Sequence, residues 1–151
     1  MKKRLDVLLV ERGLAARCEP PELARELARA TLGMIGGQYL DVTGAQTDLA
    51  SLHRLKTGCL FSASVACALW VADVPEREQA PWRAFADEVG LLFQIVDDIL
   101  DEDGYLLEHG ADGARALADE AAERAQARLG EVPGDTSVLA GIVSGLAART
   151  S

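Results

Sequence analysis

Residues 92–101, LFQIVDDILD, repeat their apolar and polar positions with the period of an α-helix, which restricts the folds open to this chain. On a helix that advances about 100° per residue, four apolar side chains share one stripe, namely Leu92, Ile95, Val96 and Ile99. Four polar side chains share the opposite stripe, namely Gln94, Asp97, Asp98 and Asp101. Such a helix buries its apolar face against another element. The acidic face is then either solvated or bound to a cation, and the spacing alone leaves both interpretations open.

The rest of the chain has the composition of a helical protein. Its 151 residues are 49% hydrophobic, which is enough for one domain with a buried core. Ala and Leu are abundant and the β-branched runs that mark strands are missing, so we predict an all-α protein. We expect helices over about 22–40, 47–72, 73–102 and 110–129, and a short one ending near residue 149. Asp48 (or Thr47) and Asp73 are the candidate N-caps.

The charge balance disfavours some classes of partner. Acidic residues number 24 and basic residues 15, and the resulting net charge of −9 repels nucleic acid and anionic membranes. No stretch reaches the roughly eighteen apolar residues of a membrane span, so we expect no integral membrane segment. The three cysteines are odd in number and lack metal-ligand spacing, which favours a reducing environment and a cytoplasmic location.

The acidic stripe lacks the cations that usually relieve like charges on a solvated helix. Neither Lys nor Arg occurs from Ala84 to Ala114. Two carboxylates about 6 Å apart repel by roughly 3 kcal/mol at an effective dielectric near 20. Carboxylates that supply only part of a coordination shell suit Mg²⁺, which keeps waters and bridges to phosphates. A cation site that serves a diphosphate is therefore favoured over a solvated face.

The segment GMIGGQYLD (33–41) places three glycines inside a helical pattern, each of which costs about 1 kcal/mol relative to Ala. Something must need their small size, and close helix packing is the simplest explanation. Gln38 and Asp41 are three residues apart, so both are candidates to face the same cavity as the acidic stripe.

The segment LHRLKTG (52–58) places His53, Lys56 and Thr57 on one helix face. A Lys and a Thr at the mouth of a buried helix can hold a phosphate by charge and by a hydroxyl hydrogen bond. The alternative for Lys56 is a snorkelling side chain with no ligand. We interpret His53 as a packed or half-exposed polar residue.

Taken in this order and spacing, GMIGGQYLDV (33–42), LHRLKTGCLFSASV (52–65) and FQIVDDILDEDG (93–104) resemble the C-terminal half of the trans-polyprenyl diphosphate synthases. These are the farnesyl and geranylgeranyl diphosphate synthase family, and the resemblance covers residues 22 to about 130. It implies a partial isoprenoid-synthase helical bundle in which Mg²⁺ bridges aspartate-rich motifs to an allylic prenyl diphosphate. The implied reaction ionises that substrate, and isopentenyl diphosphate then attacks the cation and lengthens the chain.

The resemblance also implies roles for individual residues. Asp97, Asp98 and Asp101 match the second aspartate-rich motif and would bind Mg²⁺. Lys56 and Thr57, together with Gln94, match catalytic positions. The implied substrate-binding residues are Gln38, Asp41, Lys56 and Thr57.

The first aspartate-rich motif of that family is absent from this sequence, and DEAAE (119–123) is better explained as solvated. We therefore expect this chain to supply one wall of an active site and to be inactive alone or dependent on a complementary chain. The alternative is a non-catalytic helical module that binds Mg²⁺ or prenyl diphosphate, or that pairs with a synthase. Exposed apolar cavity walls predict a homodimer or pairing with a synthase-like chain.

Residues 2–14, KKRLDVLLVERGL, resemble a different family, the N-terminus of hemolysin-like ribosomal RNA methyltransferases. We predict that residues 1–17 form an unrelated basic and apolar lead and that residues 18–151 form the synthase-like domain. An RNA-associated protein is a third hypothesis. The acidic body of the chain argues against it, so we expect no nucleic acid partner.

Overall fold

Every regular element that the structure describes is helical, which confirms the predicted all-α class. The structure is a computed structural model and describes residues 21–45 and 47–150. The elements in chain order are α3 (Glu22–Thr43), α4 (Leu49–His53), the π-helical turn η1 (Arg54–Gly58), α5 (Cys59–Val71), the 3-10 turn η2 (Glu76–Glu78), α6 (Ala80–Asp101), α7 (Gly104–Gly130), α8 (Ser137–Ala147) and the 3-10 turn η3 (Ala148–Thr150). The predicted lead over residues 1–17 lies outside the described residues.

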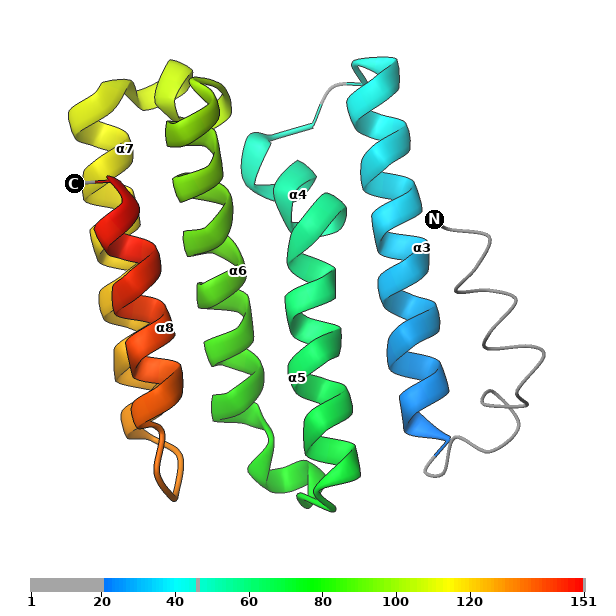
Figure 1. Cartoon of the computed structure of the whole chain (residues 1–151). Helices are drawn as coiled ribbons and strands as arrows, with labels where there is room; N and C mark the ends of the chain where they lie inside the picture. The colour runs from blue at the N-terminus through cyan, green and yellow to red at the C-terminus, as the bar shows by residue number, and fades with distance from the viewer. Residues whose placement is uncertain (1–20, 46, 151) are drawn as a thin grey trace.

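The helices form a row in which α3, α5 and α6 lie side by side and run in alternating directions (Figure 1). Helices α7 and α8 cover the side of α6 that faces away from α3. The predicted apolar stripe of α6 faces the core, where Leu92, Ile95 and Val96 are at most 1% exposed. Helix α7 meets it with a row of fully buried small side chains, namely Ala114, Ala118, Ala121 and Ala125. Such small residues let the two helices approach closely.

Local signals set some helix ends as expected and not others. Asp48 caps α4, since its side chain accepts a hydrogen bond from the Ser51 backbone N–H at 2.8 Å. Asp73 was expected to cap the next helix, and this expectation was wrong. Asp73 adopts a left-handed φ of 55°, a 3-10 turn follows, and α6 begins at Ala80 with Pro81 in its first turn.

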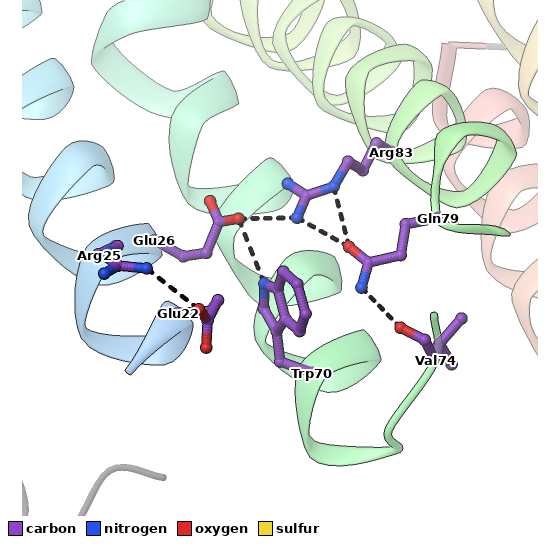
Figure 2. Close-up of polar contacts among 7 residues, drawn as sticks. All are labelled: Glu22, Arg25, Glu26, Trp70, Val74, Gln79 and Arg83. Carbon is purple, nitrogen blue, oxygen red and sulfur yellow. Dashed lines mark hydrogen bonds and ion pairs between the residues drawn. The ribbon is translucent and has the colours of Figure 1, made fainter. Parts of the chain in front are cut away.

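A polar network joins three helices at the end where α3 begins (Figure 2). The Arg83 guanidinium of α6 donates to Glu26 of α3 at 2.7 Å and to Gln79 at 2.9 Å. Trp70 of α5 donates to the same Glu26 carboxylate at 3.5 Å. Gln79 is 1% exposed and donates to the backbone carbonyl of Val74 at 2.8 Å, so its buried amide is satisfied.

One of the three glycines of α3, Gly37, serves close packing, which is the explanation of their small size that the sequence favoured. A Cβ on Gly37 would lie 2.5 Å from the backbone nitrogen of Lys56, so α3 and η1 touch backbone to backbone there. A Cβ on Gly33 would lie 3.5 Å from the Cys59 side chain, an ordinary contact distance. A Cβ on Gly36 would meet nothing within 4 Å. Gly37 therefore fixes the distance between α3 and the turn that carries Lys56.

Adjacent glycines provide a matched test of this contact. Gly37→Ala should lower the free energy of unfolding by about 2 kcal/mol, because backbone has to move to admit the new methyl group. Gly36→Ala should raise it by up to about 1 kcal/mol, because Ala favours a helix and meets no neighbour. Urea unfolding of both variants checks the pair, and equal effects at the two positions would contradict the close approach at Gly37.

Candidate functional site

The predicted site residues gather at one end of the helix row. The C-terminal ends of α3 and α6 lie at the same end as α4 and η1, at the top of Figure 1. Helix α3 packs on η1, and η1 packs on α6. Three segments far apart in sequence, 33–42, 52–65 and 93–104, therefore meet at this polar end of the bundle.

Gln38, Asp41 and Lys56 come together in the structure. From the sequence, Gln38 and Asp41 were expected to face a cavity shared with the acidic stripe, and their contact with Lys56 was not predicted. The Lys56 ammonium Nζ donates to Asp41 Oδ2 at 2.8 Å, across fifteen residues of sequence. Gln38 Nε2 donates to the same oxygen at 3.4 Å. The hydrogen bond from Lys56 is the largest cause that holds the pKa of Asp41 below its usual value. Burial opposes this shift, and the charge of Lys56 adds to it. Lys56 and the exposed Arg54 thus place two cations on the turn η1.

Lys56 lies in a π-helical turn, which the sequence did not predict. Turn η1 interrupts what would otherwise be a single helix from α4 to α5. Thr57, the residue after Lys56, is half-buried in the same turn. Short π-helical segments often occur at functional sites, because the extra residue turns neighbouring side chains relative to a regular helix.

His53 is buried between two polar side chains of α6, so its interpretation as a packed polar residue was incomplete. It is 9% exposed, and its Nδ1 lies 2.5 Å from Gln94 Oε1. Its Nε2 lies 3.1 Å from Asp98 Oδ2, within ion-pair distance. The two groups are not oriented for a hydrogen bond, and the buried Nε2 has no hydrogen-bond partner. We therefore describe His53 and Asp98 as an electrostatic contact that a small ring rotation could convert into a hydrogen bond.

The oxygen atoms around His53 restrict its protonation. A neutral imidazole has one N–H, whereas both ring nitrogens here face oxygen. A doubly protonated ring would satisfy both Gln94 and Asp98. A neutral ring does so only if Gln94 turns its amide to donate to Nδ1, which leaves the proton on Nε2. With Gln94 Oε1 facing Nδ1, as in the structure, a neutral ring carries its proton on Nδ1 and leaves Nε2 without one.

Asp98 has a second partner on the opposite side. Its Oδ2 accepts a hydrogen bond from the Tyr105 backbone N–H at 2.8 Å. A Cβ on Gly104 would collide with the Asp98 carboxylate, and Gly104 also has a left-handed φ of 42°. The Tyr105 ring stacks on the His53 ring with centroids 5.5 Å apart. The carboxylate of Asp98 thus lies in a closed frame built from α4, α6 and α7.

The other two carboxylates of the predicted metal motif have different surroundings. Asp97 and Asp101 are exposed and one helical turn apart, whereas Asp98 is 8% exposed. Across residues 21–45 and 47–150, no three His, Cys, Asp or Glu side chains lie together as ligands of one metal ion. The exposed pair nevertheless has the chemistry to supply two oxygens to a hard cation whose other ligands are water and phosphate.

An apolar cavity of about 250 Å³ lies next to these residues. It separates α4 and η1 from the middle of α6, and His53 and Gln94 line its polar end. Gly58 and Gly90 line it as well, and their lack of side chains brings η1 close to α6. A small apolar space thus adjoins the polar end of the bundle.

Comparison with known proteins places this arrangement in one family. A family model described as polyprenyl synthetase matches residues 7–111. The chain is 31% identical over 119 residues to the small subunit of a heterodimeric geranylgeranyl pyrophosphate synthase of Arabidopsis thaliana, covering 77% of this chain and 36% of that protein. It is 38% identical over 82 residues to the farnesyl diphosphate synthase of Bacillus subtilis, covering 51% of this chain and 28% of that protein.

A solved structure has a similar fold. A protein from a Marinomonas species, provisionally described as a farnesyl-diphosphate synthase, superposes with a TM-score of 0.70 at 32% identity, covering 86% of this chain and 56% of that one. The all-α fold is therefore that of the isoprenoid synthases, as the resemblance implied. This chain spans only 36% and 28% of the lengths of the two curated relatives above.

The family match begins at residue 7, so it includes part of the segment expected to be an unrelated lead. The resemblance of residues 2–14 to ribosomal RNA methyltransferases finds no support in these comparisons.

None of the helices within residues 21–45 and 47–150 combines the length and the hydropathy needed to cross a membrane. The cytoplasmic location stays a prediction.

The pair formed by Lys56 and Asp41 can be tested by titration. Lys56→Met should raise the pKa of Asp41 toward the ordinary Asp value of about 3.9, because the donor and its charge are lost. The folded pKa is depressed, so the pair contributes stability above the unfolded-chain pKa and loses it as the pH falls through the folded pKa. The free energy of unfolding of Lys56→Met should therefore fall less than that of the wild type as the pH is lowered through this range.

Carboxyl-carbon NMR titration measures the pKa of Asp41 directly. Urea unfolding at several pH values measures how the free energy of unfolding depends on pH. Arg128→Met is the matched control, since it removes an exposed cation from an ion pair with Glu131 elsewhere on the surface. An Asp41 pKa that is the same in wild type and in Lys56→Met would show that the two groups do not pair in solution.

Proposed function

This chain belongs to the polyprenyl synthetase family, and we propose that the polar end of its bundle binds an allylic prenyl diphosphate together with Mg²⁺ for isoprenoid chain elongation. The observation that carries this proposal is the place of Lys56, which pairs with Asp41, on the turn η1 that packs on α6. The acidic end of α6 lies in a stretch that has no Lys or Arg from residue 84 to 114. A diphosphate is bound favourably by a cationic side chain such as that of Lys56. The exposed carboxylates would repel the diphosphate unless a metal ion lies between the two.

Each residue has a role suited to its position. Lys56 would hold a diphosphate oxygen by charge, and the Thr57 hydroxyl would add a hydrogen bond. Gln38 and Asp41 orient the Lys56 ammonium, and Asp41 would give it up in part when the diphosphate binds. Gln94 lies on the cavity wall beside His53, where its amide can face the reacting end of the substrate.

Asp97 and Asp101 would supply carboxylate oxygens to Mg²⁺. When bound, this ion neutralises the charge that develops on the departing diphosphate. In the proposed reaction the carbon–oxygen bond of the allylic diphosphate breaks and a carbon–carbon bond forms to the double bond of isopentenyl diphosphate. A proton then leaves the new chain, which restores a double bond and balances the charge. The cavity beside His53 would receive part of the apolar chain of the substrate.

Binding of the substrate tests the proposal directly. Calorimetric titration with geranyl diphosphate should show binding that requires Mg²⁺. Lys56→Met should weaken it by about tenfold to a hundredfold, because a charge-assisted hydrogen bond of about 1.5 to 3 kcal/mol is lost. Arg128→Met, in the exposed pair with Glu131, should leave the affinity unchanged.

Absence of Mg²⁺-dependent binding at millimolar concentrations would overturn the proposal. Because the sequence carries only one aspartate-rich motif, we expect this chain to bind geranyl diphosphate without efficient turnover. Rapid elongation with added isopentenyl diphosphate would contradict that part.

A second candidate function is that of a subunit that pairs with another chain. One relative is named as the small subunit of a heterodimeric synthase. The chain also exposes an apolar stripe on α3, the α3 stripe, whose members are 55% to 77% exposed, namely Leu32, Ile35, Tyr39 and Val42. Contiguous exposed apolar residues on one helix face mark association surfaces. We propose that the α3 stripe pairs this chain with a second copy or with a synthase-like chain.

Sedimentation of the purified chain checks this pairing. We expect self-association at tens of micromolar, reduced by Ile35→Glu and Val42→Glu because each would place a charge in an apolar interface. Val138→Glu on α8, at a residue 75% exposed, is the control and should leave the association unchanged. If the wild-type chain sediments only as a monomer, the proposal of self-pairing is wrong. If all three variants have equal effects, the interface does not lie on α3.

A further inference from the structure

We propose that His53 is a positioning residue that holds Asp98 as its partner, so that Asp97 and Asp101 alone face the ion. The inference rests on the function proposed above and goes beyond it, because it divides three carboxylates of one motif into two roles. The function proposed above gives the buried His53 no part in binding. The present inference gives it a role in arranging the carboxylates of the site.

The first support is the position of His53 in the chain. It is the last residue of α4 and directly precedes η1, the turn that carries Lys56. Both of its ring nitrogens face α6, one toward Gln94 and the other toward Asp98. One ring therefore links the turn that would hold the diphosphate to the helix that would hold the ion.

The second support is the burial of the contact. His53 and Asp98 are 9% and 8% exposed, so each polar group depends on the other for compensation. His53 Nε2 lacks a hydrogen-bond partner and lies 3.1 Å from Asp98 Oδ2. This buried contact holds the Asp98 carboxylate turned inward, toward α4.

The third support is the second contact of Asp98. The Tyr105 N–H donates to Oδ2, the same oxygen that faces His53, and the absence of a side chain at Gly104 makes room for the carboxylate. An ion could bind this oxygen only by displacing both Tyr105 and His53. Asp97 and Asp101 have no such competing contact among those described, and both are exposed.

Two substitutions of His53 separate its two contacts. His53→Gln can place an amide N–H near the position of Nε2 and keep the contact to Asp98. His53→Asn can place one near Nδ1 and keep only the contact to Gln94. Titration with Mg²⁺ and inorganic diphosphate should give His53→Gln an affinity within about threefold of wild type. His53→Asn and His53→Ala should bind at least tenfold more weakly, because the Lys56 turn then loses its link to α6 through residue 98. An Asn at position 98 keeps an oxygen for that link. Arg128→Met, in the exposed pair with Glu131, is the control away from the site and should bind as wild type does.

Substitutions of the carboxylates test the division of roles. Asp98→Asn should keep affinity for Mg²⁺ and diphosphate within about threefold, because its amide oxygen can still accept from Tyr105. Asp97→Asn and Asp101→Asn should each lose at least tenfold. Imidazole nitrogen NMR of the metal-free protein adds a readout without ion or substrate. The His53 resonances should shift in Asp98→Asn and remain in place in Asp101→Asn.

The outcomes distinguish the two proposals. A wild-type chain that does not bind Mg²⁺ and diphosphate overturns the proposed function. Wild-type binding that His53→Ala leaves unchanged, or that Asp98→Asn weakens as much as Asp97→Asn does, overturns the positioning role and leaves the function standing. Equal losses in His53→Gln and His53→Asn would mean that the imidazole acts through packing rather than through Asp98.

Discussion

The packing of α6 against α7 is the interaction on which the rest of the molecule depends. The apolar stripe of α6 is almost fully buried against a row of alanines, and that contact turns the opposite, acidic face toward α4 and η1. A rotation of α6 by one residue would take Asp98 away from His53 and expose part of the core. Burial of Leu92, Ile95 and Val96 therefore sets the orientation of the polar residues.

Electrostatics then select what this face can bind. The three carboxylates of one helix end do not share one environment, because Asp98 is enclosed while Asp97 and Asp101 meet solvent. On the neighbouring turn, Lys56 is held by Asp41 on α3. A cation and an exposed acidic pair at the same end of the bundle suit a ligand that brings its own negative charge and shares a metal ion with the protein.

Much of the fold was open to sequence reasoning, because helical periodicity and capping are local. The stripe of α6, the Asp48 cap and the close packing at Gly37 followed from residues near one another in the chain. The start of α6 did not, because the left-handed Asp73 and the 3-10 turn after it gave no distinct local signal.

For the site, the motifs singled out Lys56 and Asp41 as candidates, but not the contacts of His53. Those contacts are to Gln94 and Asp98, more than forty residues away, and a single His carries no pattern that reveals such partners. The π-helical turn was equally hidden, since LHRLKTG reads as a regular helix.

Helix α3 is held near both ends and along its length. Arg83 holds Glu26 near its start, Gly37 rests on the backbone of η1, and Lys56 holds Asp41 near its end. These three contacts, spaced along α3, prevent the helix from sliding along its neighbours and from rotating about its own axis. The apolar residues on its outer side therefore point in one constant direction, and a chain that docks there meets a rigid template rather than a surface that adapts. The same helix contacts the turn that carries Lys56, through Gly37 and Asp41, so the outer face of α3 and that turn keep a fixed relation to each other.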